Sequence, residues 1–142
     1  MNIQTLRLEN LIPYWRNPRK NDVAVEKVKE SIREYGYVTP IVVDRTLTII
    51  AGHTRYRALK ELGYDEVDVI IADMPEKKAK EFRIIDNRTS EYATWTADLA
   101  LELKEFSDPE FLDIFFPDVK LEPDFAKATA LKAEQGIDEI AE

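Results

Sequence analysis

Up to about residue 90, short β-branched runs alternate with segments whose apolar residues recur at helical spacing. Strands are expected near 3–8, 41–44, 48–51 and 67–72, and helices near 22–35, 54–62 and 75–86. The run at 67–72 is apolar almost throughout, which predicts a buried strand. This alternation predicts an α/β (α+β) fold in which helices flank a small mixed sheet.

Helical spacing also predicts which side chains face the core. The expected inward positions recur every three or four residues within each helix: Val25, Val28, Ile32 and Tyr35; Tyr56, Leu59 and Leu62; Ala79, Phe82 and Ile85. Two further helices are expected, one with Leu99, Leu103 and Phe106 inward and one beginning at Asp108-Pro109. We therefore predict a domain at 1–92, a helical extension at 93–116 and a tail or linker, weakly helical or leading into a further domain, at 117–142.

Composition and charge narrow the function classes. The 142 residues include no cysteine and one histidine, which excludes disulfides, cysteine nucleophiles and a His-rich metal site. No apolar run approaches the ~20 residues of a membrane span, and the N-terminus has no signal-peptide core, so no membrane partner and a cytoplasmic location are expected. Residues 1–60 have a formal net charge of +5, and residues 61–142 have a formal net charge of −13. The basic half is the one expected to face phosphate, while the net charge of −8 argues against a free-standing DNA binder.

The segment 47–63 predicts an anion site between a strand and a helix. Gly52 permits a sharp turn with close backbone approach, and the N–H groups of the following helical turn point toward a ligand. His53, Thr54 and Arg55 lie at this helix start, and Arg55 is the expected phosphate ligand. Arg57 is expected to point away from Arg55 and to serve the helix surface or a second phosphate, since residues two apart on a helix differ by roughly 200°. The alternative is an ordinary glycine turn with solvated arginines.

Two other polar stretches are candidates for chemistry. Arg16, Arg19 and Lys20 form a basic cluster in a loop, which either touches nucleic acid or is a solvated connector. Asp86-Asn87 is expected at the end of the helix that begins near residue 75, where it is either a helix end and loop or a carboxylate and an amide placed for Mg²⁺ or a nucleotide.

The order of these motifs resembles the N-terminal domain of ParB proteins, with the ParB/sulfiredoxin-like fold. The resemblance rests on Asn17-Pro18-Arg19, Thr39-Pro40-Ile41-Val42-Val43, the run 51–58 and Asp86-Asn87. The run Gly-His-Thr-Arg-Tyr-Arg with the later Asp-Asn-Arg-Thr-Ser-Glu looks most like ParB-like domains of phages and mobile elements, which often accompany DNA methyltransferases.

The resemblance implies a nucleotide site. Gly52, Thr54 and Arg55 would face phosphate, Thr39 and Pro40 would line the site, and Asp86 and Asn87 would face Mg²⁺. This chain has His53 and Thr54 where ParB usually has Glu and Arg, and Ser90 where a basic residue is usual. Free-serine kinases of the same fold carry a similar Gly-His turn, which implies phosphoryl transfer near His53 as an enzyme alternative.

These observations favour a nucleotide- or phosphate-binding ParB-like domain in DNA metabolism, acting as a regulatory or accessory module. Its expected cofactor is a nucleoside triphosphate, CTP or ATP, with Mg²⁺. Its expected partner is DNA or a DNA-modifying enzyme such as a methyltransferase, and a homodimer stays open. The alternatives are a phosphoryl-transfer enzyme or nuclease that uses His53 and Asp86, and a protein-interaction module with an inactive pocket.

Overall fold

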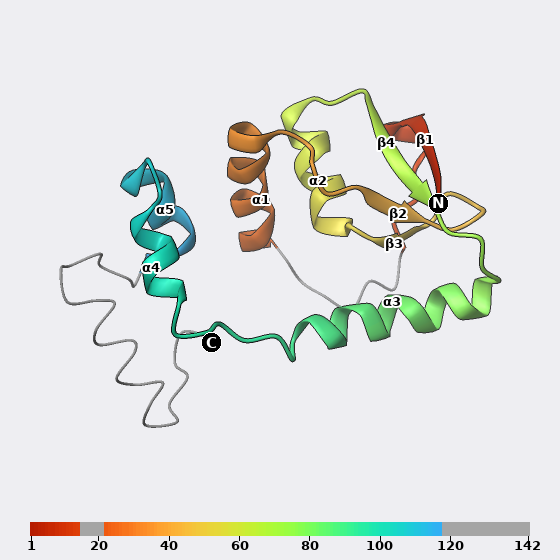
Figure 1. Ribbon diagram of the computed structural model, residues 1–142. Coiled ribbons are helices and arrows are strands. Elements are labelled where there is room, and N and C mark those ends of the chain that lie inside the picture. The colour runs from red at the N-terminus through yellow and green to blue at the C-terminus, as the bar shows by residue number, and fades with distance from the viewer. Residues whose placement is uncertain (15–21, 118–142) are drawn as a thin grey trace. The chain divides into compact units, whose positions relative to one another are not determined.

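The computed structural model describes residues 1–14 and 22–117. The chain forms two compact units, Met1–Asn87 and Arg88–Glu142. The first unit contains the sheet and the predicted phosphate turn (Figure 1).

The first unit is built on a four-stranded sheet with the order β1-β4-β2-β3. Its strands are β1 (Asn2–Arg7), β2 (Ile41–Val43), β3 (Ile49–Ala51) and β4 (Glu66–Ile71). The inner strand β4 pairs antiparallel with β1 and parallel with β2, with Ile41 opposite Val69. β2 and β3, both predicted as strands, pair antiparallel. The mixed α/β class predicted from the sequence is therefore confirmed.

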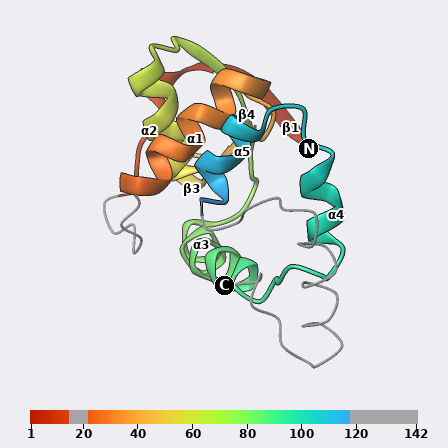
Figure 2. The same cartoon turned by 90° about the vertical axis from the view of Figure 1, so that its left-hand side faces the viewer.

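Helices α1 (Asp22–Tyr35) and α2 (His53–Leu62) lie side by side in both views and pack against each other (Figures 1 and 2). A short 3-10 helix, η1 (Leu8–Asn10), follows β1. The core joins apolar side chains from the sheet and from both helices: Leu8, Leu11, Val25, Ile32, Ile41, Val43, Ile49, Tyr56, Ala58, Leu59, Val67 and Val69. Burial of each large apolar side chain contributes about 1.5–3 kcal/mol, so this core fixes the position of α2 and of the turn before it.

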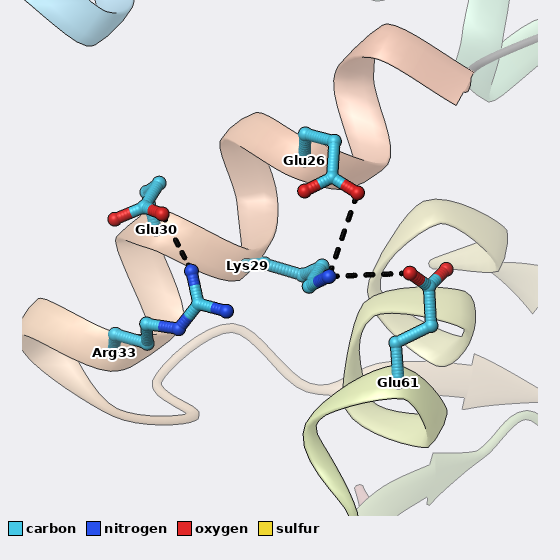
Figure 3. Close-up of polar contacts among 5 residues, drawn as sticks. All are labelled: Glu26, Lys29, Glu30, Arg33 and Glu61. Atoms are coloured by element: carbon cyan, nitrogen blue, oxygen red, sulfur yellow. Dashed lines mark hydrogen bonds and ion pairs between the residues drawn. The ribbon is translucent and has the colours of Figure 1, made fainter.

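An ion pair joins α1 to α2 (Figure 3). Lys29 of α1 reaches Glu61 of α2 at 3.2 Å and Glu26 of its own helix at 3.4 Å. The hydrogen bond to Glu61 raises the pKa of the Lys29 ammonium. Arg33 and Glu30 form a separate pair within α1. Ion pairs at a surface usually contribute little stability, so the core rather than these pairs holds the two helices together.

Two burial predictions in this unit are wrong. Tyr35, predicted to face the core, is 56% exposed because it is the last residue of α1. The strand at 67–72 was predicted to be buried throughout, but the first four residues of β4 alternate, with Val67 and Val69 buried and Glu66 and Asp68 exposed. This alternation arises because the core covers one face of β4.

Helix α3 (Glu76–Ser90) differs most from the prediction. Ala79 is buried as predicted, but Phe82 and Ile85 are 40% and 57% exposed. The helix also continues beyond Asp86, where the sequence analysis placed its end. No glycine or proline interrupts it, and Arg88 in its last turn suits the negative end of the helix dipole.

The second unit contains α4 (Leu99–Lys104) and α5 (Pro109–Phe115). Leu99, Leu103 and Leu112 form a small buried cluster. The predicted start at Asp108-Pro109 is confirmed, because the Asp108 carboxylate accepts hydrogen bonds from the N–H groups of the first turn. Phe106, predicted inward, follows the end of α4 and is 40% exposed. No helix in the described residues is long and apolar enough to cross a membrane. Residues 118–142 of the predicted tail lie outside the described part of the chain.

Candidate phosphate-binding site

The site begins at Gly52, between the last residue of β3 and the first residue of α2. Gly52 has φ +103°, a conformation that side chains disfavour. A Cβ atom there would lie 2.9 Å from Arg55 Nη1 and 3.1 Å from Ile41 Cγ1. As a glycine it offers no side chain to cap the first turn of α2, whose N–H groups have no partner within the helix. The turn therefore brings main chain and guanidinium together at the positive end of a helix dipole.

Arg55 folds back across this turn. Its Nη1 donates a hydrogen bond to the main-chain oxygen of Pro40, at 2.9 Å. Burial lowers the pKa of the Arg55 guanidinium, while Tyr37 and Asp86 act in the opposite direction. The negative charge of Asp86 in α3 thus acts on the same guanidinium. Arg55 thus contacts Pro40, a predicted site residue that lies far from it in the sequence.

A cavity of about 140 Å³ opens beside Arg55. Its lining comes from the end of α1, the loop that follows and α2: Val28, Ser31, Ile32, Gly36, Tyr37, Val38, Thr39 and Arg55. The Tyr37 hydroxyl donates to the main-chain oxygen of Asp68 at 2.6 Å and accepts from Ile41 N–H at 2.7 Å, which fixes one wall. The predicted neighbourhood of Thr39, Pro40 and Arg55 is present in the structure.

His53 is the first residue of α2 and is half-buried. Its Nε2 accepts a hydrogen bond from the main-chain N–H of Tyr14 at 3.2 Å. Burial, and secondarily the charge of Arg83, lower the pKa of the imidazole to about 4. His53 is therefore neutral at neutral pH.

Arg83 is a residue of this region that sequence reasoning missed. Its side chain in α3 is buried, its Nε donates to the main-chain oxygen of Ile49 at 3.0 Å, and its Cζ lies 3.8 Å from the centre of the Tyr14 ring. Within the described part of the chain, its Nη1 is buried without a hydrogen-bond partner. Burial lowers the pKa of the guanidinium. The only signal in the sequence was its spacing of four from the buried Ala79.

Other predicted residues are arranged differently. Arg57 forms an ion pair with Asp22 of α1 at 2.9 Å, so it stabilises the helix pair on the other side of α2. Thr54 is half-buried in the first turn of α2. The basic cluster of Arg16, Arg19 and Lys20 lies outside the described residues.

Asp86 and Asn87 lie within α3 rather than after it. In residues 1–14 and 22–117, no three His, Cys, Asp or Glu side chains cluster as a metal site. A carboxylate and an amide suit Mg²⁺ only where phosphate oxygens and water supply the remaining ligands, which is how Mg²⁺ commonly binds with nucleotides.

Comparison with known proteins shows which family the chain matches. The ParB N-terminal domain family matches residues 1–88. The chain is 36% identical over 87 residues to a probable chromosome-partitioning protein ParB of Campylobacter jejuni, a match that covers 58% of this chain and 31% of that protein. It is 31% identical over 90 residues to the stage 0 sporulation protein J of Bacillus subtilis, with 60% and 32% covered. The chain thus spans about a third of the length of these curated relatives.

A solved structure shares the fold. It is the C-terminally truncated chromosome-partitioning protein ParB of Caulobacter crescentus complexed with CTP-γ-S, with a TM-score of 0.66 and 23% identity over 80% of this chain and 70% of that one. At this identity the likeness shows the fold alone. The family match, by contrast, extends over more than half of the chain and includes β1 to α2 and the Asp86 region. The protein therefore belongs to the family defined by the ParB N-terminal domain.

Proposed function

We propose that this chain is a nucleotide-binding ParB-type domain in which the turn at Gly52 and Arg55 holds the phosphate groups. The observation that carries the proposal is the position of the Arg55 guanidinium, which lies over Gly52 at the start of α2 and lines the adjacent cavity. A cation, a helix N-terminus and a cavity are the three features that a nucleoside phosphate needs.

The nucleotide that we propose is CTP. The support is the shared fold with the Caulobacter ParB complexed with CTP-γ-S. Asp86, with Asn87 beside it, would hold a Mg²⁺ ion that arrives with the phosphates, and ATP is the alternative nucleotide. His53 and Thr54 stand where ParB usually has Glu and Arg, so we expect the affinity and any hydrolysis to differ from those of ParB.

Regarding partners, we propose DNA or a DNA-modifying enzyme such as a methyltransferase, in a phage or mobile-element setting. The support for a DNA-related role is the family itself, whose curated relatives include chromosome-partitioning proteins. The absence of an acidic or histidine cluster in the described residues gives no support to a metal-dependent nuclease. The proposed role is therefore regulatory binding, with the nucleotide as its ligand.

A thermal-shift screen tests this function. CTP, ATP, GTP and UTP are each added with and without Mg²⁺, and a ligand at 100-fold over its Kd should add about 2.7 kcal/mol of stability. We expect the largest shift with CTP and Mg²⁺ and little shift for the Arg55→Ala variant. If no nucleoside triphosphate shifts the wild-type transition, the proposed function is wrong.

A further inference from the structure

His53 sits in the proposed phosphate turn, but its environment is not that of a proton-transfer residue. The main-chain N–H of Tyr14 donates to His53 Nε2. An imidazole nitrogen that accepts a hydrogen bond carries no proton, so in the neutral ring the proton must be on Nδ1. The single lone pair of the ring is thereby already used.

Arg83 reinforces this state from α3. Its guanidinium is buried against the Tyr14 ring and is held by the carbonyl of Ile49, the first residue of the strand that leads into the turn. A fixed positive charge near the ring opposes the imidazolium form. Tyr14, β3 and α3 thus meet around the Arg83 side chain. Among the described residues, the Tyr14 N–H and the Arg83 guanidinium face His53, and its own helix carries the cation Arg55 two positions further on.

We propose that Tyr14 and Arg83 are positioning residues that hold His53 as a neutral Nδ1–H donor for a phosphate oxygen, rather than as an acid–base catalyst. The role rests on the proposed function, since it concerns the same turn. It explains how a histidine serves in a site that already contains Arg55: it adds a directional donor without adding charge. It also assigns His53 to ligand binding and not to proton transfer, because a base would first have to lose its bond to Tyr14.

The ring state can be measured directly because His53 is the only histidine in the chain. Long-range ¹H–¹⁵N spectra of the labelled protein should show the proton on Nδ1 at neutral pH, and no titration until the pH approaches the range near 4. In Arg83→Met the midpoint should rise toward the ordinary value, whereas Lys77→Met, an exposed cation on the same helix, should leave it unchanged. A proton on Nε2, or an ordinary titration near 6.5 in the wild type, would overturn the proposal even if no Arg83 variant folds.

Binding of inorganic tripolyphosphate with Mg²⁺ tests the donor role. His53→Asn keeps an amide N–H close to the position of Nδ1, whereas His53→Leu removes the donor. We expect the asparagine variant to bind within a few-fold of wild type, and the leucine variant to lose about tenfold or more, as expected for a hydrogen bond to a charged group. Equal affinities for the two variants would overturn the role of His53 but leave the phosphate site intact. No binding of tripolyphosphate or of any nucleotide to the wild type would overturn the site and this role together.

Discussion

Replacing Gly52 with alanine should damage both the fold and the site, for two separable reasons. The first is the backbone, because φ +103° costs a non-glycine residue about 1–3 kcal/mol. The second is space. The new Cβ would lie 2.9 Å from Arg55 Nη1, 3.1 Å from Ile41 Cγ1 and 3.3 Å from Ile41 Cα, and crowding of a packed region typically costs about 1–3 kcal/mol. The guanidinium can move, but the main chain of Ile41 in β2 cannot do so without disturbing the sheet.

Gly63→Ala is the matched control for this prediction. Gly63 follows α2 with φ +84°, and its new Cβ would meet no atom of the described residues beyond its chain neighbours within 4 Å, so alanine there carries only the backbone cost. Urea unfolding followed by circular dichroism should show Gly52→Ala losing about 1–3 kcal/mol more than Gly63→Ala, the cost of crowding. Gly52→Ala should also weaken nucleotide binding, whereas Gly63→Ala should not. Equal losses of stability in the two variants would refute the close approach of Arg55 and Ile41 to the turn.

Three further predictions concern single residues. His53 has a lowered pKa in the folded state, so between pH 6.5 and about 4 the unfolded chain binds a proton that the folded chain does not. Lowering the pH from 6.5 to about 4 should therefore reduce the free energy of unfolding by at most about 3 kcal/mol, and His53→Asn should lack this loss. Arg83→Ala should destabilise the first unit by about 2–5 kcal/mol in urea unfolding, because it leaves a cavity and an unpaired Ile49 carbonyl, and a loss below about 1 kcal/mol would contradict its burial. Asp108→Ala should cost about 1 kcal/mol of α5 stability by removing the N-cap, which amide hydrogen exchange of that helix would report.

The sheet and the glycine turn before α2 were predictable because their signals are local. Short β-branched runs, the glycines after α1 and α2 and the apolar spacing of α2 each involve neighbours in sequence. The spacing of Arg55 and Arg57 also indicated opposite directions, and the structure places one at Pro40 and the other at Asp22.

The orientation of α3 was not predictable by the same reasoning. Apolar spacing favoured a face containing Phe82 and Ile85, since a charged residue is normally assigned to solvent. In the structure Arg83 faces inward because the Ile49 carbonyl and the Tyr14 ring, which are far away in sequence, accept its guanidinium. The contact between Tyr14 and His53 is equally non-local. Its donor is a main-chain N–H, which every residue except proline has, so the residue type gives no indication of it. Such sites become visible only when the chain has been folded.

The central claim is tested most directly by calorimetric titration of the variants Arg55→Ala and Arg57→Ala. The ligand is CTP with Mg²⁺, or the nucleoside triphosphate that gives the largest thermal shift. Both variants remove one guanidinium from α2, but only Arg55 lies over Gly52. Arg55→Ala should fold with a loss of about 1 kcal/mol from its bond to Pro40, and should weaken binding by about 1.5–3 kcal/mol. Arg57→Ala should lose less binding, because its partner is Asp22. Wild-type affinity in Arg55→Ala, or a larger loss in Arg57→Ala, would contradict the placement of the phosphate site.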